Sequence, residues 1–205
     1  VHEWQLVFVW LAVAVLVDGL DGTFARMADV KRVLPGFDGA LLDNLVDYLT
    51  YGFVPALFFG AAGLVPEGWG FAAAAIVLLS SAYQFCQADA KTEDHCFKGF
   101  PSYWNLLAFY LFLLDLPAWV NASIVAVCAV LVFVPVKYAY PSRMTRYRRS
   151  TLILTALWAA ALVTMLVLYP KIPAWLMAAS LLYVAYYLVL SLTLTLSSRR
   201  GESVN

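Results

Sequence analysis

The sequence predicts an all-α integral membrane protein, a polytopic bundle of about seven transmembrane helices. Three observations support this fold class: the composition, the length of the apolar segments and the distribution of charge between the loops. Hydrophobic residues make up 63% of the 205 residues, charged residues only 13%, and the mean hydropathy is +0.80. A soluble domain of this size carries roughly twice this charged fraction. Most of the apolar surface should therefore face lipid or neighbouring helices.

Seven apolar segments approach the roughly 20 residues that a helix needs to cross a bilayer. Proline and glycine residues separate them, as at Pro35-Gly36, Pro101 and Pro117. Since no soluble region interrupts the segments, we expect a single transmembrane domain over 1–205. The first segment starts almost at Val1, and we expect one N-terminal helix to be missing. The predicted helices are 4–25, 40–64, 69–88, 102–117, 119–138, 151–169 and 173–196.

The basic residues predict the orientation of these helices. If the helices alternate in direction, the loops 26–39, 89–101 and 139–150 and the C-terminal tail share one side. All but one of the 13 lysines and arginines belong to that side, and Lys171 is the exception. Basic loops mark the cytoplasmic side, so we expect that side to be cytoplasmic.

Two acidic clusters lie at the expected cytoplasmic ends of the first two helices. Asp18 and Asp21 are three residues apart, and Asp43 and Asp47 are four apart, so each pair shares a helix face. An ionised carboxylate in an apolar helix costs several kcal/mol unless it is compensated. The connection 27–38 allows the two helices to run antiparallel, and we expect the four carboxylates to meet at one depth.

Oxygen ligands in this number suit Mg²⁺, Mn²⁺ or Ca²⁺ rather than zinc, and we expect Mn²⁺ or Mg²⁺, with two ions. Two such ions stabilise the charge of a phosphoryl group during displacement. The alternatives are a structural ion-pair network and a cation transport path lined by carboxylates. Small residues at Gly22, Ala25 and Gly39, with Arg26 in the same register, favour a ligand site over both.

The pattern Asp18-x2-Asp21-Gly22-x2-Ala25-Arg26-x12-Gly39-x3-Asp43-x3-Asp47 resembles the signature of the CDP-alcohol phosphotransferases. These enzymes transfer a phosphatidyl or related group from a CDP-linked donor to an alcohol and release CMP. The resemblance implies a dimer whose motif begins on the second transmembrane helix. It implies metal binding by Asp18, Asp21, Asp43 and Asp47, with Asp47 also the general base, a cytidine site at Gly22, Ala25 and Gly39, and a phosphate contact from Arg26.

The twelve residues between Arg26 and Gly39 exceed the roughly eight typical of most of that family. This longer spacer resembles the bacterial phosphatidylcholine synthases, as do the segments 83–105 and 137–143. The resemblance implies transfer from CDP-diacylglycerol to choline at the cytoplasmic face of the bacterial inner membrane. Other acceptors, such as serine, glycerol phosphate or inositol phosphate, remain the alternative within the family.

Choline carries a quaternary ammonium, which aromatic faces and a nearby carboxylate recognise. We expect Tyr103 and Trp104 to contribute to a choline cage, Asn105 to position the acceptor, and Asp94 to supply the carboxylate. The alternative for each aromatic residue is an interfacial anchor.

A second basic group follows the fifth predicted helix. We expect Ser142 and Arg143 to bind the donor's phosphates, and Arg148 and Arg149 to contact the lipid surface.

Overall fold

The computed structural model describes residues 2–90, 92, 96–141, 144 and 147–199. The chain divides into two compact units. Unit 1 comprises Val1–Phe85 and Ser102–Ala129, and unit 2 comprises Cys86–Pro101 and Val130–Asn205.

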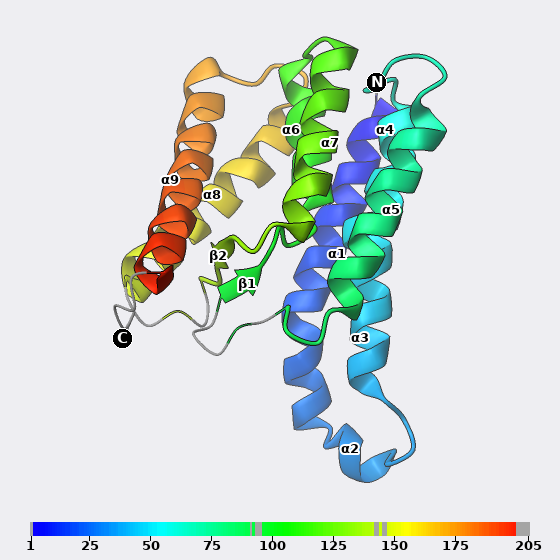
Figure 1. The fold of residues 1–205 in the computed structure, drawn as a ribbon, viewed down its shortest axis with the longest axis vertical. Coiled ribbons are helices and arrows are strands. Elements are labelled where there is room, and N and C mark those ends of the chain that lie inside the picture. The colour runs from blue at the N-terminus through cyan, green and yellow to red at the C-terminus, as the bar shows by residue number, and fades with distance from the viewer. Residues whose placement is uncertain (1, 91, 93–95, 142–143, 145–146, 200–205) are drawn as a thin grey trace. The chain divides into compact units, whose positions relative to one another are not determined.

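Unit 1 is built from helices. Its α1 and α3 run antiparallel and are joined through the short α2 (Figure 1). A π-helix, η1, follows α3 directly and leads into α4, so the chain is helical without a break from Gly39 to Ala61. The helices are α1 (His2–Met27), α2 (Val30–Val33), α3 (Gly39–Asp47), η1 (Tyr48–Phe53), α4 (Val54–Ala61), α5 (Gly70–Cys86), α6 (Trp104–Leu114) and α7 (Ala118–Phe133), whose last turn belongs to unit 2.

Aromatic side chains pack α1, α4 and α6 together. Phe8 of α1 lies between Phe58 of α4 and Phe109 of α6, with ring centroids 4.8 and 5.1 Å away. All three rings are buried. Helix α4 also packs against α5. Gly60 of α4 and Gly70 of α5 lie so close that a Cβ on Gly60 would be 3.0 Å from the Gly70 Cα.

Unit 2 combines two long helices with a small antiparallel ribbon. Strands β1 (Cys96–Lys98) and β2 (Lys137–Ala139) pair in the register Phe97 with Tyr138. Helices α8 (Arg148–Leu168) and α9 (Ala174–Arg199) follow. Polar side chains of α9 bind β2, since the backbone N–H of Lys137 donates to Thr195 and that of Ala139 to Ser191. This satisfies backbone groups of the ribbon that would otherwise lack partners.

The described helices agree with the predicted all-α membrane fold. Three of them, over Glu3–Met27, Arg148–Leu168 and Ala174–Ser197, are long and apolar enough to cross a membrane. The apolar α5, α6 and α7 are shorter. At 1.5 Å per residue, the 11 residues of α6 extend only about 17 Å.

Several predicted helix ends are wrong, among them that of 40–64, which lies at Ala61. The segment 119–138 does not continue as a helix beyond Phe133, because Pro135 cannot donate to the helix ladder, and Lys137–Ala139 forms β2 instead. The segment 102–117 is helical only over Trp104–Leu114, since Asp115 takes a left-handed conformation with φ 47°.

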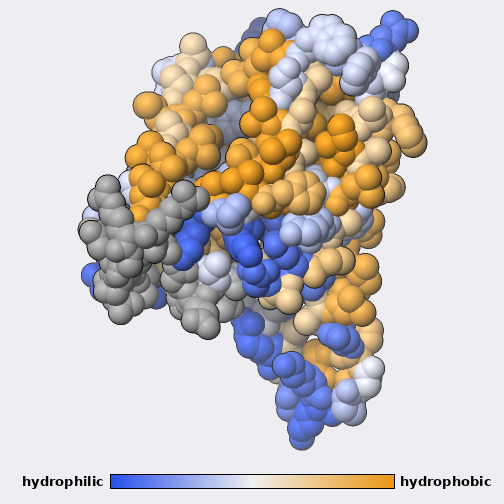
Figure 2. Space-filling view, in the orientation of Figure 1, coloured by the Kyte–Doolittle hydropathy of each residue, from blue (hydrophilic) through white to orange (hydrophobic). Residues whose placement is uncertain are grey.

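The outer faces of the helices are apolar, as a membrane protein requires. In unit 1, Figure 2 shows hydrophobic side chains over much of the visible surface of α5, with hydrophilic side chains at the end that carries α2. Phe71 and Leu79 of α5 are 87% and 72% exposed. Such faces are stable against lipid but not against water.

Candidate active site

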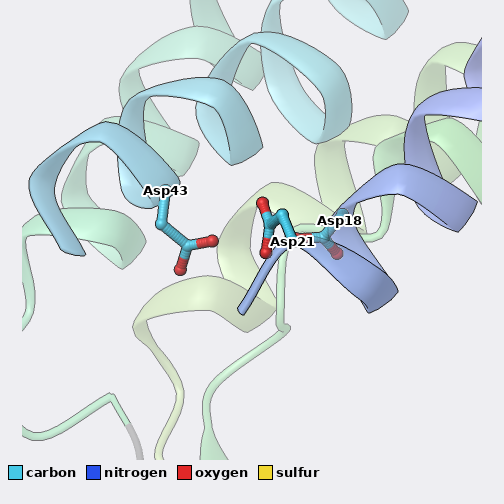
Figure 3. A group of neighbouring side chains, drawn as sticks. All are labelled: Asp18, Asp21 and Asp43. Atoms are coloured by element: carbon cyan, nitrogen blue, oxygen red, sulfur yellow. The ribbon is translucent and has the colours of Figure 1, made fainter. Parts of the chain in front are cut away.

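Three carboxylates of the predicted motif come together in unit 1. Asp18 and Asp21 project from α1, and Asp43 projects from α3 toward them (Figure 3). One oxygen from each lies within 4.8 Å of the other two. None of the three side chains is buried. They therefore form an accessible acidic group between two antiparallel helices.

The local sequence explains why these helices present their carboxylates to each other. On α1, the three-residue spacing puts Asp18 and Asp21 on one face. On the other side, α3 begins at Gly39 because the Asp38 side chain accepts a hydrogen bond from the Leu41 backbone N–H, at 3.0 Å. Asp43 consequently lies just over one turn into α3.

The charges of this group fit a divalent cation. Two like charges this close repel by about 3–4 kcal/mol at an effective dielectric constant of about 20. A bound cation would reverse the sign of this energy. Because all three donors are hard carboxylate oxygens, they suit Mg²⁺ or Mn²⁺ better than a metal that prefers sulfur or nitrogen.

Asp47 lies one turn further along and is not part of the group of three among the described carboxylates. Its side chain is half-buried, at the point where α3 gives way to η1. It interacts electrostatically with Tyr51, whose hydroxyl donates to Asp18 Oδ2 at 3.0 Å. The fourth carboxylate thus lies in more enclosed surroundings than Asp21.

Tyr51 was not predicted as a site residue. The sequence does contain a signal for it, because Gly39, Asp43, Asp47 and Tyr51 follow one another at four-residue intervals. Tyr103, at the start of α6, also interacts electrostatically with Tyr51.

The small residues of the motif lie beside the carboxylates. A Cβ on Gly22 would lie 3.3 Å from Nη1 of Arg26, so this glycine gives room to the arginine. The same arginine donates to Thr23 Oγ1 at 3.0 Å and is exposed. At Gly39, an added Cβ would meet no atom within 4 Å. Packing among the described residues therefore does not require glycine at 39, and Ala25 is likewise exposed.

The predicted choline residues of α6 differ in their surroundings. Tyr103 is half-buried and precedes the helix, whereas Trp104 is fully buried. The Asn105 side chain accepts a hydrogen bond from the Leu106 backbone N–H, at 2.8 Å, which stabilises the first turn of α6. Beside them, the hydroxyl of the buried Ser102 has no hydrogen-bond partner among the described residues.

Three other predicted site residues lie outside the described residues: Asp94, Ser142 and Arg143. The aromatic residues near the first of them pack within unit 2. Phe97 stacks on Tyr140 with ring centroids 4.6 Å apart. Nearby, the Lys98 ammonium binds Asp89 and holds the pKa of that carboxyl below its usual range.

Known proteins with sequences similar to this chain are named phosphatidylcholine synthase. The chain is 41% identical to a phosphatidylcholine synthase from Legionella bozemanae over 197 residues, which cover 93% of this chain and 91% of the relative. The chain belongs to the phosphatidylcholine synthase family. A phosphatidylcholine synthase from Borreliella burgdorferi is 35% identical over 96% of this chain and 85% of its own length. No family model matches the chain.

A third relative shows the same breadth of similarity. The phosphatidylcholine synthase of Legionella pneumophila is 41% identical over 93% of this chain and 77% of its own length. The similarity therefore extends far beyond the motif at residues 18–47. It agrees with the longer spacer between Arg26 and Gly39, which distinguished this family from other CDP-alcohol phosphotransferases.

Proposed function

We propose that the protein is a metal-dependent phosphatidylcholine synthase, which transfers the phosphatidyl group of CDP-diacylglycerol to choline and releases CMP. The observation that carries this proposal is the group of three carboxylates, whose oxygens lie within 4.8 Å of one another on two helices. The names of the relatives support the choline acceptor. The charge of the site supports a reaction at a phosphate.

Asp18, Asp21 and Asp43 would hold Mn²⁺ or Mg²⁺, with two ions proposed and Asp47 as a further ligand. Bound there, the cations would neutralise the diphosphate of the donor and the negative charge that develops on the leaving CMP. The donor set fits this role because it consists of carboxylates open to the surface. Carboxylates without such compensation would repel a diphosphate.

Asp47 is the proposed general base. It removes the hydroxyl proton of choline while the choline oxygen forms a bond to the phosphorus that bears diacylglycerol. The bond from that phosphorus to the CMP oxygen breaks, and CMP leaves with the electron pair. Asp47 suits this task by its position, because it lies one turn beyond Asp43 and is not part of the group of three described carboxylates.

The neighbouring residues would seat the substrates. Arg26 is exposed and would contact a phosphate of the donor, and the open space at Gly39 would admit the cytidine. Tyr103 and Trp104 would contribute aromatic faces to the choline site. The remaining substrate residues in this proposal are Asn105 and Asp94 for choline and Ser142 and Arg143 for the donor.

The lipid substrate defines where the reaction takes place. The acyl chains of CDP-diacylglycerol would stay in the bilayer while its headgroup reaches the carboxylates at the end of α1. We further propose that the protein is a homodimer in the bacterial inner membrane, with the active site facing the cytoplasm. The basic loops support that orientation through the positive-inside rule.

One assay tests the proposal. The purified protein is supplied with CDP-diacylglycerol, labelled choline and Mn²⁺ or Mg²⁺, and both phosphatidylcholine and CMP are measured. Parallel reactions contain serine or glycerol 3-phosphate in place of choline, and a further reaction contains a chelator. We expect equal amounts of CMP and phosphatidylcholine with choline, and neither product with the chelator.

Each other outcome has a distinct meaning. Turnover of serine or glycerol 3-phosphate without turnover of choline would refute the acceptor. Full activity in the chelator would refute the metal. Cation flux through liposomes containing the protein, without CMP release, would instead show a transport path.

A further inference from the structure

We infer that Tyr51 is a positioning residue for the carboxylate group: its hydroxyl fixes the orientation of Asp18, so that the three carboxylates are preorganised for a cation. This inference rests on the proposed function for the identity of the ligand. It is drawn from the hydrogen bond of 3.0 Å between the Tyr51 hydroxyl and Asp18 Oδ2.

The hydrogen bond leaves one Asp18 oxygen free of this contact. A carboxylate has two oxygens, and Tyr51 donates to Oδ2. A fixed Oδ2 restricts rotation of the carboxyl group and so limits the positions open to the other oxygen. Groups that bind metal ligands in this way orient them, and their loss commonly weakens metal binding by roughly 10- to 100-fold.

The backbone around Tyr51 is built for this contact. Tyr51 belongs to η1, and η1 packs against both α1 and α6. A π-helix accommodates an extra residue in its turn and is frequently found at functional sites. The next residue, Gly52, is buried, and a Cβ there would lie 3.2 Å from the Ser81 side chain. The chain next to Tyr51 therefore packs closely against α5.

Tyr51 also connects the two halves of the proposed active site. Its hydroxyl contacts Asp18 of the metal group, and both Asp47 and Tyr103 interact with it electrostatically. The proposed base and a proposed choline residue thus lie around the tyrosine that orients a proposed metal ligand.

The same helix offers a matched control. Tyr48 lies one turn earlier in η1, and its hydroxyl donates to the Leu78 backbone carbonyl of α5 at 3.2 Å. Both tyrosines are half-buried and hold η1 to a neighbouring helix. Of these two hydroxyl hydrogen bonds, that of Tyr51 ends on a carboxylate of the group, and that of Tyr48 ends on a backbone carbonyl. Replacing either by phenylalanine removes one hydroxyl and preserves the ring.

The experiment measures Mn²⁺ binding directly, by the loss of the electron paramagnetic resonance signal of free Mn²⁺ on titration with detergent-solubilised protein. We expect Tyr51→Phe to weaken Mn²⁺ binding by roughly 10-fold or more, and Tyr48→Phe to leave it within about twofold of the unmodified protein. Thermal unfolding without metal reports stability separately. If Tyr51→Phe does not fold, Tyr51→Met removes the donor with a smaller, flexible side chain.

A double-mutant cycle then tests whether Tyr51 acts through Asp18. We expect Asp18→Asn to weaken Mn²⁺ binding and Tyr51→Phe to add little to that loss, because the two residues form one interaction. Unchanged Mn²⁺ affinity in Tyr51→Phe, or full additivity with Asp18→Asn, would overturn the inference.

The outcomes separate this inference from the proposed function. Mn²⁺ binding that depends on Tyr51, in a protein that does not turn over choline, would retain the role of Tyr51 and refute the synthase. Phosphatidylcholine synthesis by the unmodified protein, with normal Mn²⁺ affinity in Tyr51→Phe, would support the synthase and refute the role of Tyr51. Absence of Mn²⁺ binding by the unmodified protein would refute both the metal site and the inference.

Discussion

Asp47 differs from the three carboxylates that meet between α1 and α3. It lies at the junction with η1, where it is half-buried as Asp18 is, and its oxygens are not part of the group of three described carboxylates. The motif alone treats the four aspartates alike. The geometry therefore favours a different role for Asp47, and the role proposed above is proton transfer.

The variant Asp47→Asn tests this role. Since the amide cannot accept the choline proton, we expect kcat to fall by roughly 100- to 10,000-fold, the usual contribution of a general base. Binding of the CDP-diacylglycerol donor should remain measurable. The rate is followed as CMP release, with Glu67→Gln, which changes a carboxylate outside the motif, as the control. A near-normal rate in Asp47→Asn would refute the base.

Gly39 provides a test of the proposed cytidine site. An added methyl group there meets no atom of the described residues within 4 Å, apart from the neighbouring backbone of its own helix, so Gly39→Ala should leave thermal unfolding unchanged. It should lower kcat/KM for CDP-diacylglycerol by roughly 10-fold or more if the space holds the donor, since small misplacements of a substrate are costly. The matched control is Gly36→Ala, also in open space. Equal kinetics for the two variants would argue against a donor site at Gly39.

Sequence spacing predicted the meeting of Asp18, Asp21 and Asp43, but not that Asp47 would lie outside their group. The four-residue interval from Asp47 to Tyr51 likewise did not reveal the bond from Tyr51 to Asp18. Intervals of three and four residues define helix faces, and an antiparallel connection brings two such faces together. The bond from Tyr51 to Asp18 depends instead on a π-helical turn and on the packing of η1 against α1. Neither property follows from the periodicity of η1's own residues.

At the scale of the elements, hydropathy located the helices and missed the ribbon. Long apolar segments are recognisable because crossing a bilayer imposes a length. The three-residue strands β1 and β2 pair Cys96 with Ala139 across a large separation in sequence. So short a pair has no periodicity to detect and depends on α9, whose Thr195 and Ser191 bind β2.

The crossing of α4 and α5 makes a prediction about stability. A Cβ on Gly60 would lie 3.0 Å from the Gly70 Cα, a backbone atom that cannot move without shifting α5. We expect Gly60→Ala to lower the free energy of unfolding by about 1–3 kcal/mol, as overpacking does. Ala61→Val, at the exposed neighbouring position, should change it by less than about 0.5 kcal/mol. Thermal unfolding in detergent measures both, and equal stability would show that α5 accommodates the methyl group.

At the scale of the whole molecule, composition supports the membrane assignment, and loop charge predicts an orientation. Three described helices have the length and composition of membrane spans. The predicted cytoplasmic side contains all but one of the 13 basic residues. Because basic residues resist translocation, this distribution predicts the side on which each loop lies.

Cysteine labelling in cells tests the orientation. After replacement of the free cysteines Cys86, Cys96 and Cys128, a single cysteine is placed at Arg32, at Glu67 or at Lys171. A membrane-impermeant maleimide should label Glu67→Cys and Lys171→Cys in intact spheroplasts, and Arg32→Cys only after permeabilisation. Labelling of Arg32→Cys in intact spheroplasts would reverse the orientation and the compartment of the active site.

The π-helix η1 also makes the number of residues in this segment matter. Each residue of an α-helix turns the chain by about 100°, so deleting one residue from Tyr48–Phe53 would convert a wide turn into an ordinary one and change the register of everything after it. Either Phe58 would leave its contact with Phe8, or the motif aspartates would rotate away from α1. We therefore expect the segment to tolerate substitutions more readily than changes of length. Homologous enzymes should keep the same number of residues here even where the residues themselves differ.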